Sequence, residues 1–129
     1  MSQQDFTEHR SLLSNSVTDF ARGVDVARVR KLRETKTECD RAVWKQMADL
    51  GWLGVLVPEQ YGGMGLKLGD MAIVAQGLAR ALVPEPLTAA AVLAARVLEG
   101  SNNESLKKKL LEGLVSGDIL PAVAWQEQA

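Results

Sequence analysis

The sequence has few of the residues from which catalytic and metal sites are usually built. Its 129 residues include one histidine, His9, and one cysteine, Cys39. A single cysteine cannot form an intramolecular disulfide, and one histidine and one cysteine far apart do not make a metal site. No local pattern pairs His9 with a nucleophile, so we interpret it as a surface residue rather than as a catalytic base.

The chain also lacks a strong charge of either sign. Its formal net charge is −1, from 15 basic and 16 acidic residues. Binding to nucleic acid needs a surface of basic residues that neutralises a row of phosphates, so we expect no nucleic-acid partner. A local basic cluster is present, and we interpret it as a solvated face. It consists of Arg28, Arg30, Lys31, Arg33 and Lys36.

Long hydrophobic runs are absent too. The most apolar segment, residues 87–98, is interrupted by Thr88 and Arg96. It is shorter than the roughly 18 apolar residues that a membrane-spanning helix requires. The segment Met1–Asp5 lacks the basic and apolar regions that begin a secretory signal. We therefore expect a cytoplasmic protein that does not enter the membrane.

The feature that the sequence does have is helical periodicity. Apolar residues recur every three to four positions in most of the chain, which is typical of helices with one buried face. The pattern predicts helices over residues 6–23, 41–50, 70–82 and 87–98, and one behind Glu104. Residues 25–36 could form a short helix or an irregular connection. The sequence therefore predicts an all-α bundle of about five or six helices.

Residues that favour helix ends support these boundaries. Asp40 is a plausible N-cap for the helix over 41–50, and Gly51 follows it where a left-handed residue often ends a helix. Pro84 and Pro86 cannot continue the helix before them. Residues 101–104 have the spacing of a capping box for the last helix.

The segment between Gly51 and Leu66 is rich in glycine. We expect residues 52–57 to cross the surface of the helices as an extended link, and Gly62, Gly63 and Gly65 to supply positive φ angles. These glycines do not match the dinucleotide-binding pattern G-x-G-x-x-G, because the third glycine, Gly69, comes one residue late. The loop is either structural or contacts a ligand through its backbone.

The residues alone do not point to an activity. The carboxylates are single and come without a partner that would tune one as a general base. After Gly117 the helical pattern weakens and β-formers appear, so we expect residues 119–129 to be extended. This change of character suggests that the chain is a piece of a longer protein.

Residues 44–66 nevertheless resemble the acyl-CoA dehydrogenase family. The resemblance rests on a tryptophan-containing helix, a Leu-Gly-Trp step and a Pro-Glu-x-Tyr-Gly-Gly-x-Gly-Leu stretch. Its positions are Trp44, Met47, Leu50, Gly51, Trp52, Gly54, Pro58, Glu59, Tyr61, Gly62, Gly63, Gly65 and Leu66. It continues with Asp70, Leu78, Ala79, Gly100, Ser116 and Gly117, and it is weakest before Lys36.

The resemblance implies a fold and a reaction. Residues 1–118 look like the N-terminal helical domain of the family, and residues 119–129 like the start of the first strand of a β-domain. The family uses FAD to introduce an α,β double bond into an acyl-CoA thioester, and passes the electrons to an electron-transfer flavoprotein. A glutamate from a later domain removes the proton, so we name no catalytic residue in this chain.

The resemblance also implies site residues. Trp125 and Gln126 occupy positions that contact the flavin in the family, although Gln126 stands where a threonine is usual. Five positions resemble the wall of the acyl pocket, namely Glu85, Pro86, Leu87, Ala90 and Ala91. Small alanines there could leave room for a bulky or branched acyl group, or could merely allow close helix packing. The sequence of residues 83–87 resembles that of bacterial members of the family that act on steroid side chains as mixed two-subunit assemblies.

Two functional hypotheses follow. In the first, the chain is the N-terminal domain of a homo- or hetero-oligomeric acyl-CoA dehydrogenase, and alone is inactive and holds FAD weakly. In the second, it is a non-catalytic helical interaction module, or a partner subunit of a mixed enzyme. Under either hypothesis, we expect it to self-associate through its apolar C-terminal half.

Overall fold

The protein is an all-α bundle, as the sequence predicts. The structure is a computed structural model that describes residues 3–37 and 39–126, with side chains from residue 7 onward. The α-helices are α1 (Gln3–Arg22), α2 (Val26–Glu34), α3 (Arg41–Asp49), α4 (Leu68–Arg80), α5 (Ala95–Glu99) and α6 (Glu104–Ser116). Two short 3-10 turns are η1 (Trp52–Gly54) and η2 (Glu59–Tyr61), and a π-helical stretch, η3 (Thr88–Ala94), runs directly into α5.

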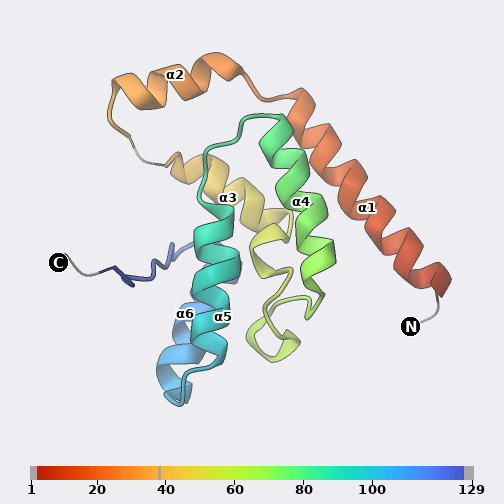
Figure 1. The fold of residues 1–129 in the computed structure, drawn as a ribbon, viewed down its shortest axis with the longest axis vertical. Helices are drawn as coiled ribbons and strands as arrows, with labels where there is room; N and C mark the ends of the chain where they lie inside the picture. The colour runs from red at the N-terminus through yellow and green to blue at the C-terminus, as the bar shows by residue number, and fades with distance from the viewer. Residues whose placement is uncertain (1–2, 38, 127–129) are drawn as a thin grey trace.

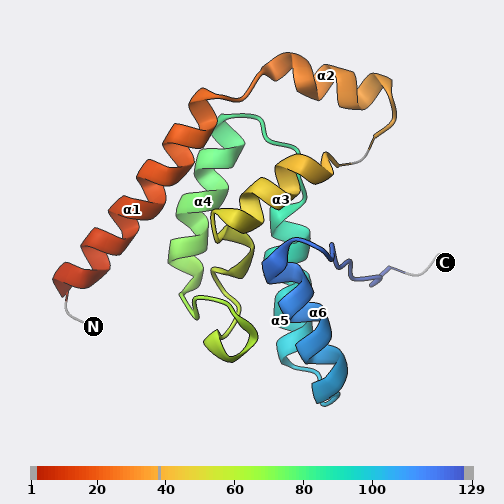
Figure 2. The ribbon, with the colours of Figure 1, turned by 180° about the vertical axis from the view of Figure 1, so that it is seen from behind.

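The helices form a compact body with one outlying helix. Figure 1 shows α1 alongside α4, the end of α3 passing behind α4, and η3, α5 and α6 grouped on the side away from α1. Figure 2 gives the same arrangement from behind, with α2 extending across one end of the molecule. No strand occurs in the described ranges, and none of their helices combines the length and apolar character needed to cross a bilayer.

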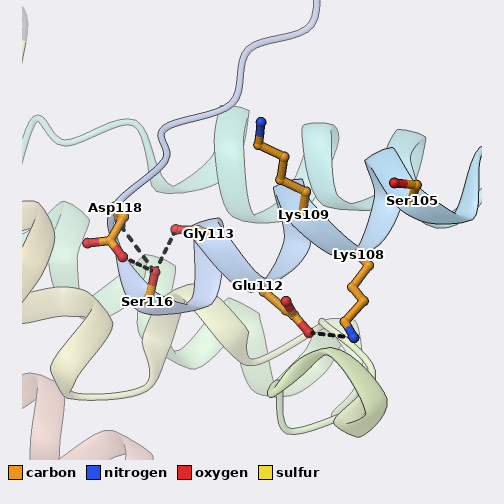
Figure 3. Close-up of a pocket in the computed structure, with 7 residues that line it drawn as sticks. All are labelled: Ser105, Lys108, Lys109, Glu112, Gly113, Ser116 and Asp118. Atoms are coloured by element: carbon orange, nitrogen blue, oxygen red, sulfur yellow. Dashed lines mark hydrogen bonds and ion pairs between the residues drawn. The ribbon is translucent and has the colours of Figure 1, made fainter.

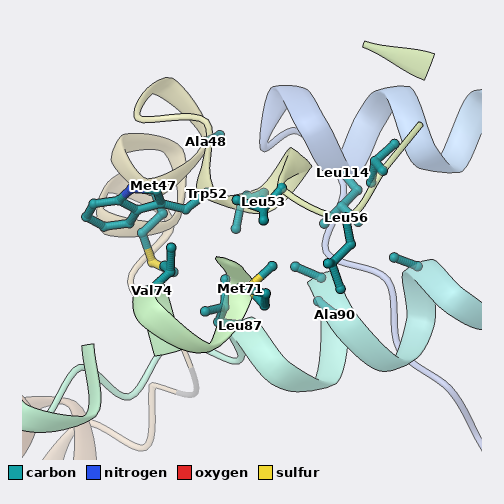
Figure 4. Close-up of a cluster of buried hydrophobic side chains, with 14 of the residues drawn as sticks. Met47, Ala48, Trp52, Leu53, Leu56, Met71, Val74, Leu87, Ala90 and Leu114 are labelled. Atoms are coloured by element: carbon teal, nitrogen blue, oxygen red, sulfur yellow. The ribbon is translucent and has the colours of Figure 1, made fainter. Parts of the chain in front are cut away.

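The core lies where α3, η1, α4, η3 and α6 meet. Figure 4 shows Met47 and Trp52 on one side of it, with Met71 and Val74 of α4 opposite. The ring of Phe20 in α1 packs against the indole of Trp52 in a T-shaped arrangement, with ring centroids 5.2 Å apart. Burial of each of these large side chains stabilises the fold by roughly 1.5–3 kcal/mol. The apolar faces of these helices therefore point toward the core, as the periodicity of the sequence predicts.

The packing of α1 on α4 depends on a glycine and an ion pair. A Cβ at Gly77 would overlap the side chain of Val17, so the two helices approach closely there. Near the start of α4, Arg10 Nε lies 2.9 Å from Oδ1 of the buried Asp70. The other oxygen of Asp70 accepts a hydrogen bond from the backbone N–H of Lys67. Asp70 thus caps α4 and joins it to α1.

Several predicted helix ends are confirmed. Asp40 caps α3 by accepting a hydrogen bond from Ala42 N–H at 2.9 Å, and Gly51 has a left-handed φ of 80°. Residues 25–36, for which the sequence left two alternatives, contain α2, capped by Asp25. The N-cap of α6 is Asn103, whose side chain accepts from Leu106 N–H, rather than Ser101. Ser101 caps the turn before it, through Asn103 N–H.

The prediction for residues 52–57 is wrong. We expected an extended link on the surface, but these residues turn tightly through η1 and are all buried. The physical reason is that six consecutive apolar or small residues bury more area in a compact turn than in an extended strand with no partner. Gly54 favours the close approach of the following loop, because a Cβ there would lie 3.3 Å from the Cα of Gly63, which is a tight contact.

The glycine loop that follows is folded against this turn. Gly62 and Gly65 have positive φ, as predicted. Gly63 is required for a different reason, since a Cβ there would overlap the carbonyl group of Val57. Backbone hydrogen bonds join the two segments, from Met64 N–H to Gly54 O at 2.8 Å and from Gly65 N–H to Val57 O at 2.9 Å.

The C-terminal residues leave the bundle. Residues 119–126 have no regular secondary structure, and residues 127–129 lie outside the described ranges. The division into a helical domain over 1–118 and a strand beginning in 119–129 therefore stays a prediction. Leu93 and Val97, one helical turn apart on η3 and α5, are about half exposed at 45% and 52%. The η3–α5 helix is thus buried on one side only.

Candidate functional site

The connection between α4 and η3 carries three of the predicted acyl-site residues. Helix α4 ends in a Schellman motif, in which Val83 N–H donates to Leu78 O at 3.0 Å and Leu82 N–H donates to Ala79 O at 3.1 Å. The left-handed residue of this motif is Leu82, with φ 54°, where glycine is usual. Pro84 and Pro86 then direct the chain into η3. We call residues 83–87 the bend.

A small cavity lies between the bend and α4. Its volume is about 210 Å³, which is below the range of a complete small-molecule site. Apart from Glu85 and Thr88, the residues around it are apolar or small. They are Ala75, Leu78, Ala79, Val83, Glu85, Pro86, Leu87, Thr88 and Ala89. The cavity could therefore accept the end of an apolar group.

The structure separates the five predicted acyl-site residues into two groups. Glu85, Pro86 and Leu87 line the cavity, and Leu87 is also part of the hydrophobic core. Ala90 and Ala91 instead are completely buried in the hydrophobic core, where Figure 4 shows Ala90 facing Leu56. Their burial is in line with the alternative in which small alanines allow close helix packing.

Glu85 is held by an arginine from a distant part of the chain. Arg28 of α2 donates from Nη1 to Oε1 at 2.6 Å and from Nη2 to Oε2 at 3.0 Å. The Glu85 side chain has 0% of its surface exposed, and the Arg28 side chain 20%. This two-pronged geometry is the strongest form of an arginine–carboxylate pair. The hydrogen bond to Glu85 raises the pKa of Arg28 above its already high value, against the opposing effect of burial.

The ion pair decides what Glu85 can do chemically. Both carboxylate oxygens are engaged by a permanent cation, so Glu85 is not a free general base. Its buried charge also affects Cys39. Burial, followed by the negative charge of Glu85, raises the pKa of the Cys39 thiol. Cys39 is therefore mainly protonated at neutral pH and is not an activated nucleophile.

A second hollow lies along the exposed face of α6. Figure 3 shows its polar lining, with Lys108 directed toward Glu112 and Ser116 bonded to Asp118. The Lys108–Glu112 contact is long, at 3.9 Å. These groups satisfy one another on an open surface and do not converge on a shared point. Within residues 3–37 and 39–126, no group of acidic, histidine or cysteine side chains could hold a metal ion.

The two predicted flavin-contacting residues lie at the end of the described tail. Trp125 is 71% exposed and Gln126 is exposed as well. An uncovered indole face can stack on a flat ring, and the Gln126 amide can both donate and accept a hydrogen bond. Both side chains are accessible, the described residues do not bring other elements around them, and their contact with a flavin stays a prediction.

Reasoning from sequence missed Arg28 as part of this site. It was grouped with the basic cluster on a solvated face, and the other four members of that cluster are indeed exposed. Only the position of Arg28 on α2, facing the bend, distinguishes it. A search for a cation able to pair with Glu85, the acidic residue between two prolines, would have considered it.

Comparison with protein families gives one match over most of the chain. The family described as "Acyl-CoA dehydrogenase, N-terminal domain" matches residues 7–118. This range begins within α1 and ends just after α6, so it covers the helical bundle described above except the first residues of α1.

Individual relatives agree with this match. Mitochondrial isovaleryl-CoA dehydrogenase of Pongo abelii is 37% identical over 89 residues, which cover 67% of this chain and 21% of that protein. Acyl-CoA dehydrogenase IpdE2 of Mycolicibacterium smegmatis is 29% identical over 116 residues, covering 88% of this chain and 37% of the relative. The chain thus spans between about a fifth and somewhat over a third of these relatives.

A solved structure has the same fold. It is a variant of the protein titled "Tcur3481-Tcur3483 steroid ACAD", with a TM-score of 0.69 and 30% sequence identity. The similarity covers 88% of this chain and 30% of that one.

Proposed function

The chain belongs to the acyl-CoA dehydrogenase family, and on that premise we propose that it supplies part of the acyl-binding wall of a FAD-dependent acyl-CoA dehydrogenase. The cavity between α4 and the bend carries this proposal. It is apolar over most of its lining, and Glu85, Pro86 and Leu87 contribute to it at the positions that the sequence resemblance indicates.

The shape of the cavity supports a branched or ring-bearing acyl group. Alanines at positions 75, 79 and 89 leave space on both sides of the bend. A proline and a leucine give it a rigid apolar edge. Among the relatives, one is named for the branched isovaleryl group and one structure is titled a steroid enzyme. Steroid degradation is thus one metabolic setting for the proposed activity.

The flavin would supply the redox chemistry, as hydride acceptor in the α,β-dehydrogenation. We propose that Trp125 and Gln126 contact one edge of it. In the proposed reaction, electrons pass to an electron-transfer flavoprotein, and the base that removes the substrate proton lies outside this chain. We also propose a cytoplasmic location, which cell fractionation tests.

The experiment is an activity assay of the full reading frame that contains this sequence. Purified protein should carry bound flavin and reduce an artificial electron acceptor with isovaleryl-CoA or a steroid side-chain CoA ester in preference to linear octanoyl-CoA. Preference for octanoyl-CoA would overturn the proposed acyl class. Absence of flavin and of activity on the whole panel would overturn the proposed function. The 129-residue chain alone should be colourless and inactive.

A second candidate is an interaction role without catalysis, as a module or as the partner subunit of a mixed enzyme. The half-exposed Leu93 and Val97 favour it, because an apolar stripe on one helix face often packs against another chain. Analytical ultracentrifugation of the 129-residue chain should show self-association. Substitution of both residues by glutamine should abolish it, and a strictly monomeric profile of the unsubstituted chain would contradict it.

A further inference from the structure

Helix α2 is attached to the rest of the protein by very little apolar packing. None of its residues is buried, and among the described residues no other helix shares an extended contact with it. Figures 1 and 2 both show it lying across one end of the bundle, connected by a link at each side. A helix of nine residues with no buried face is not stable by itself in water. Its position therefore depends on specific polar contacts.

Arg28 provides such a contact. Its two hydrogen bonds to Glu85 join residues that are 57 positions apart in the sequence. A second carboxylate, that of Asp40 at the start of α3, lies 4.0 Å from Arg28 Nη1. Arg28 thus connects α2, the beginning of α3 and the bend at a single point. The guanidinium is suited to this, because it presents several donors in one rigid plane.

The middle of the bend has little fixation of its own. Backbone hydrogen bonds hold its two ends, from Val83 N–H to Leu78 O and from Ala90 N–H to Pro86 O, both at 3.0 Å, and Leu87 is buried in the core. Between these ends, the backbone hydrogen bond is the one from Leu87 N–H to Glu85 O, at 2.8 Å. Pro84 and Pro86 have no N–H to donate. The carboxylate of Glu85 would be unpaired without Arg28, and a buried unpaired charge is strongly unfavourable. The carboxylate would then turn toward water and move the cavity wall with it.

We propose that Arg28 is a positioning residue for the acyl cavity, holding the bend in place through Glu85 without touching the acyl group. This inference rests on the proposed function. It assigns a role in substrate binding to α2, a helix that does not line the cavity. Loss of Arg28 weakens binding of the acyl group before and during the reaction alike, which raises KM and leaves kcat unchanged.

The test uses the full reading frame and the substituted protein Arg28→Met. We expect KM for the preferred acyl-CoA to rise by about tenfold or more, with kcat within about twofold of the original. Arg28→Lys should recover part of the loss, because one ammonium can reach only one carboxylate oxygen well. Arg30→Met, in the same helix at an exposed position, is the matched control and should leave both constants unchanged. An unchanged KM in Arg28→Met would overturn the inference.

A double substitution separates positioning from charge neutralisation. In Arg28→Met combined with Glu85→Gln, no unpaired charge remains, but the bend is still not anchored to α2. We expect KM to stay high. If KM returned to the original value, Arg28 would serve only to neutralise Glu85, and the positioning role would be wrong.

Hydrogen exchange tests the same role without activity. In Arg28→Met, amides of residues 81–87 and of α2 should exchange faster, while those of α6 stay as they are, so that a local effect is distinguished from global destabilisation. If the amides of the bend exchanged at the same rate in Arg28→Met as in the unsubstituted protein, the inference would be overturned. If the unsubstituted protein has no dehydrogenase activity on the panel, the proposed function fails, and the exchange data still decide whether Arg28 anchors the bend.

Discussion

The two connections that flank α4 are stabilised in different ways. The first connection, residues 51–67 between α3 and α4, is folded through its own backbone, with glycines in close contact and hydrogen bonds between its two halves. The second connection, residues 81–87 between α4 and η3, has a strained leucine at one end and an arginine–carboxylate pair from α2 in the middle. The first is fixed along its length by backbone contacts, whereas the second has backbone hydrogen bonds mainly at its ends and is fixed in the middle by side chains.

This difference indicates which connection can change without loss of the fold. In the first connection, a side chain added to a tightly packed glycine displaces backbone, and backbone cannot be moved cheaply. In the second, the exposed Leu82 and the Arg28–Glu85 pair can be exchanged while the helices of the core stay in place, although α2 loses its anchor. A segment of the second kind is well suited to line a cavity, because its side chains can vary among proteins of one fold.

The largest expected effect tests the first connection. Gly63→Ala places a Cβ on the carbonyl group of Val57, inside a segment whose residues are buried. We expect a loss of more than about 3 kcal/mol in the free energy of unfolding, or an insoluble protein. Urea denaturation measures the loss. Gly100→Ala is the control, because its Cβ would meet nothing closer than 3.6 Å and its φ is ordinary. If the two variants were equally stable, the first connection would not depend on its close backbone contacts.

The next effect concerns Asp70, in the first turn of α4, which accepts a hydrogen bond from the last residue of the first connection. Burial favours a raised pKa for this carboxyl, but hydrogen bonds from Arg10 and from Lys67 N–H together lower it below its usual value. A lowered pKa in the folded state means that the stabilisation is present above the unfolded pKa of about 3.9 and is lost as the pH falls through the folded value.

Asp70→Asn should therefore destabilise the protein by about 1–3 kcal/mol at pH 7 and make its unfolding free energy less dependent on pH below about 4. Urea denaturation at several pH values measures both. Asp19→Asn, at an exposed ion pair of α1, should change neither quantity noticeably. A variant at position 70 with the same acid dependence as the original protein would contradict this assignment.

A smaller effect tests the ion pair of the second connection. Glu85→Gln should destabilise by about 1–2 kcal/mol, because the partly exposed Arg28 can turn to water once its partner is neutral. The pKa of Cys39 should also fall, because Glu85 raises it in the present structure. The pH profile of Cys39 alkylation should move to lower pH. Glu112→Gln, on α6, should leave the profile unchanged, and a profile unmoved in Glu85→Gln would contradict the proximity of the two groups.

The smallest effect has the opposite sign. Leu82→Gly relieves a left-handed conformation that a leucine adopts at a cost, and Leu82 is mostly exposed, so little packing is lost. We expect a gain of about 0.5–1 kcal/mol in the free energy of unfolding. Leu82→Ala retains the Cβ and should show no such gain. A loss of stability in the glycine variant would mean that the leucine packs more than its exposure indicates.

The sequence predicted the features that depend on local pattern. Helix periodicity identified the buried faces of α1 and α4, and Asp40 and Gly51 marked the ends of α3. These succeed because caps and stripes act over a few residues. The compact turn at residues 52–57 was missed, because an apolar run has no periodicity that separates a buried turn from an extended link.

The candidate site was only half accessible from the sequence. The resemblance to the family indicated Glu85, Pro86 and Leu87, which line a small cavity, and their role in acyl binding stays a proposal. The pairing of Glu85 with Arg28 depends on how α2 returns across the bundle, and no local signal fixes a contact between residues so far apart. The burial of Ala90 and Ala91 could not be predicted either, because alanines in a sequence are compatible both with a cavity wall and with a packed core.

The π-helical stretch η3 marks a place where this helix contains one residue more than α-helical spacing requires. Ala95 N–H donates to Ala90 O, five residues earlier, where an α-helix would use the residue four earlier. Deleting one residue from this stretch would restore the α-helical spacing locally, because the π-helical turn already accommodates that residue as an extra one. The length of η3 can therefore change by one residue while the bend before it and α5 after it keep nearly the same orientation.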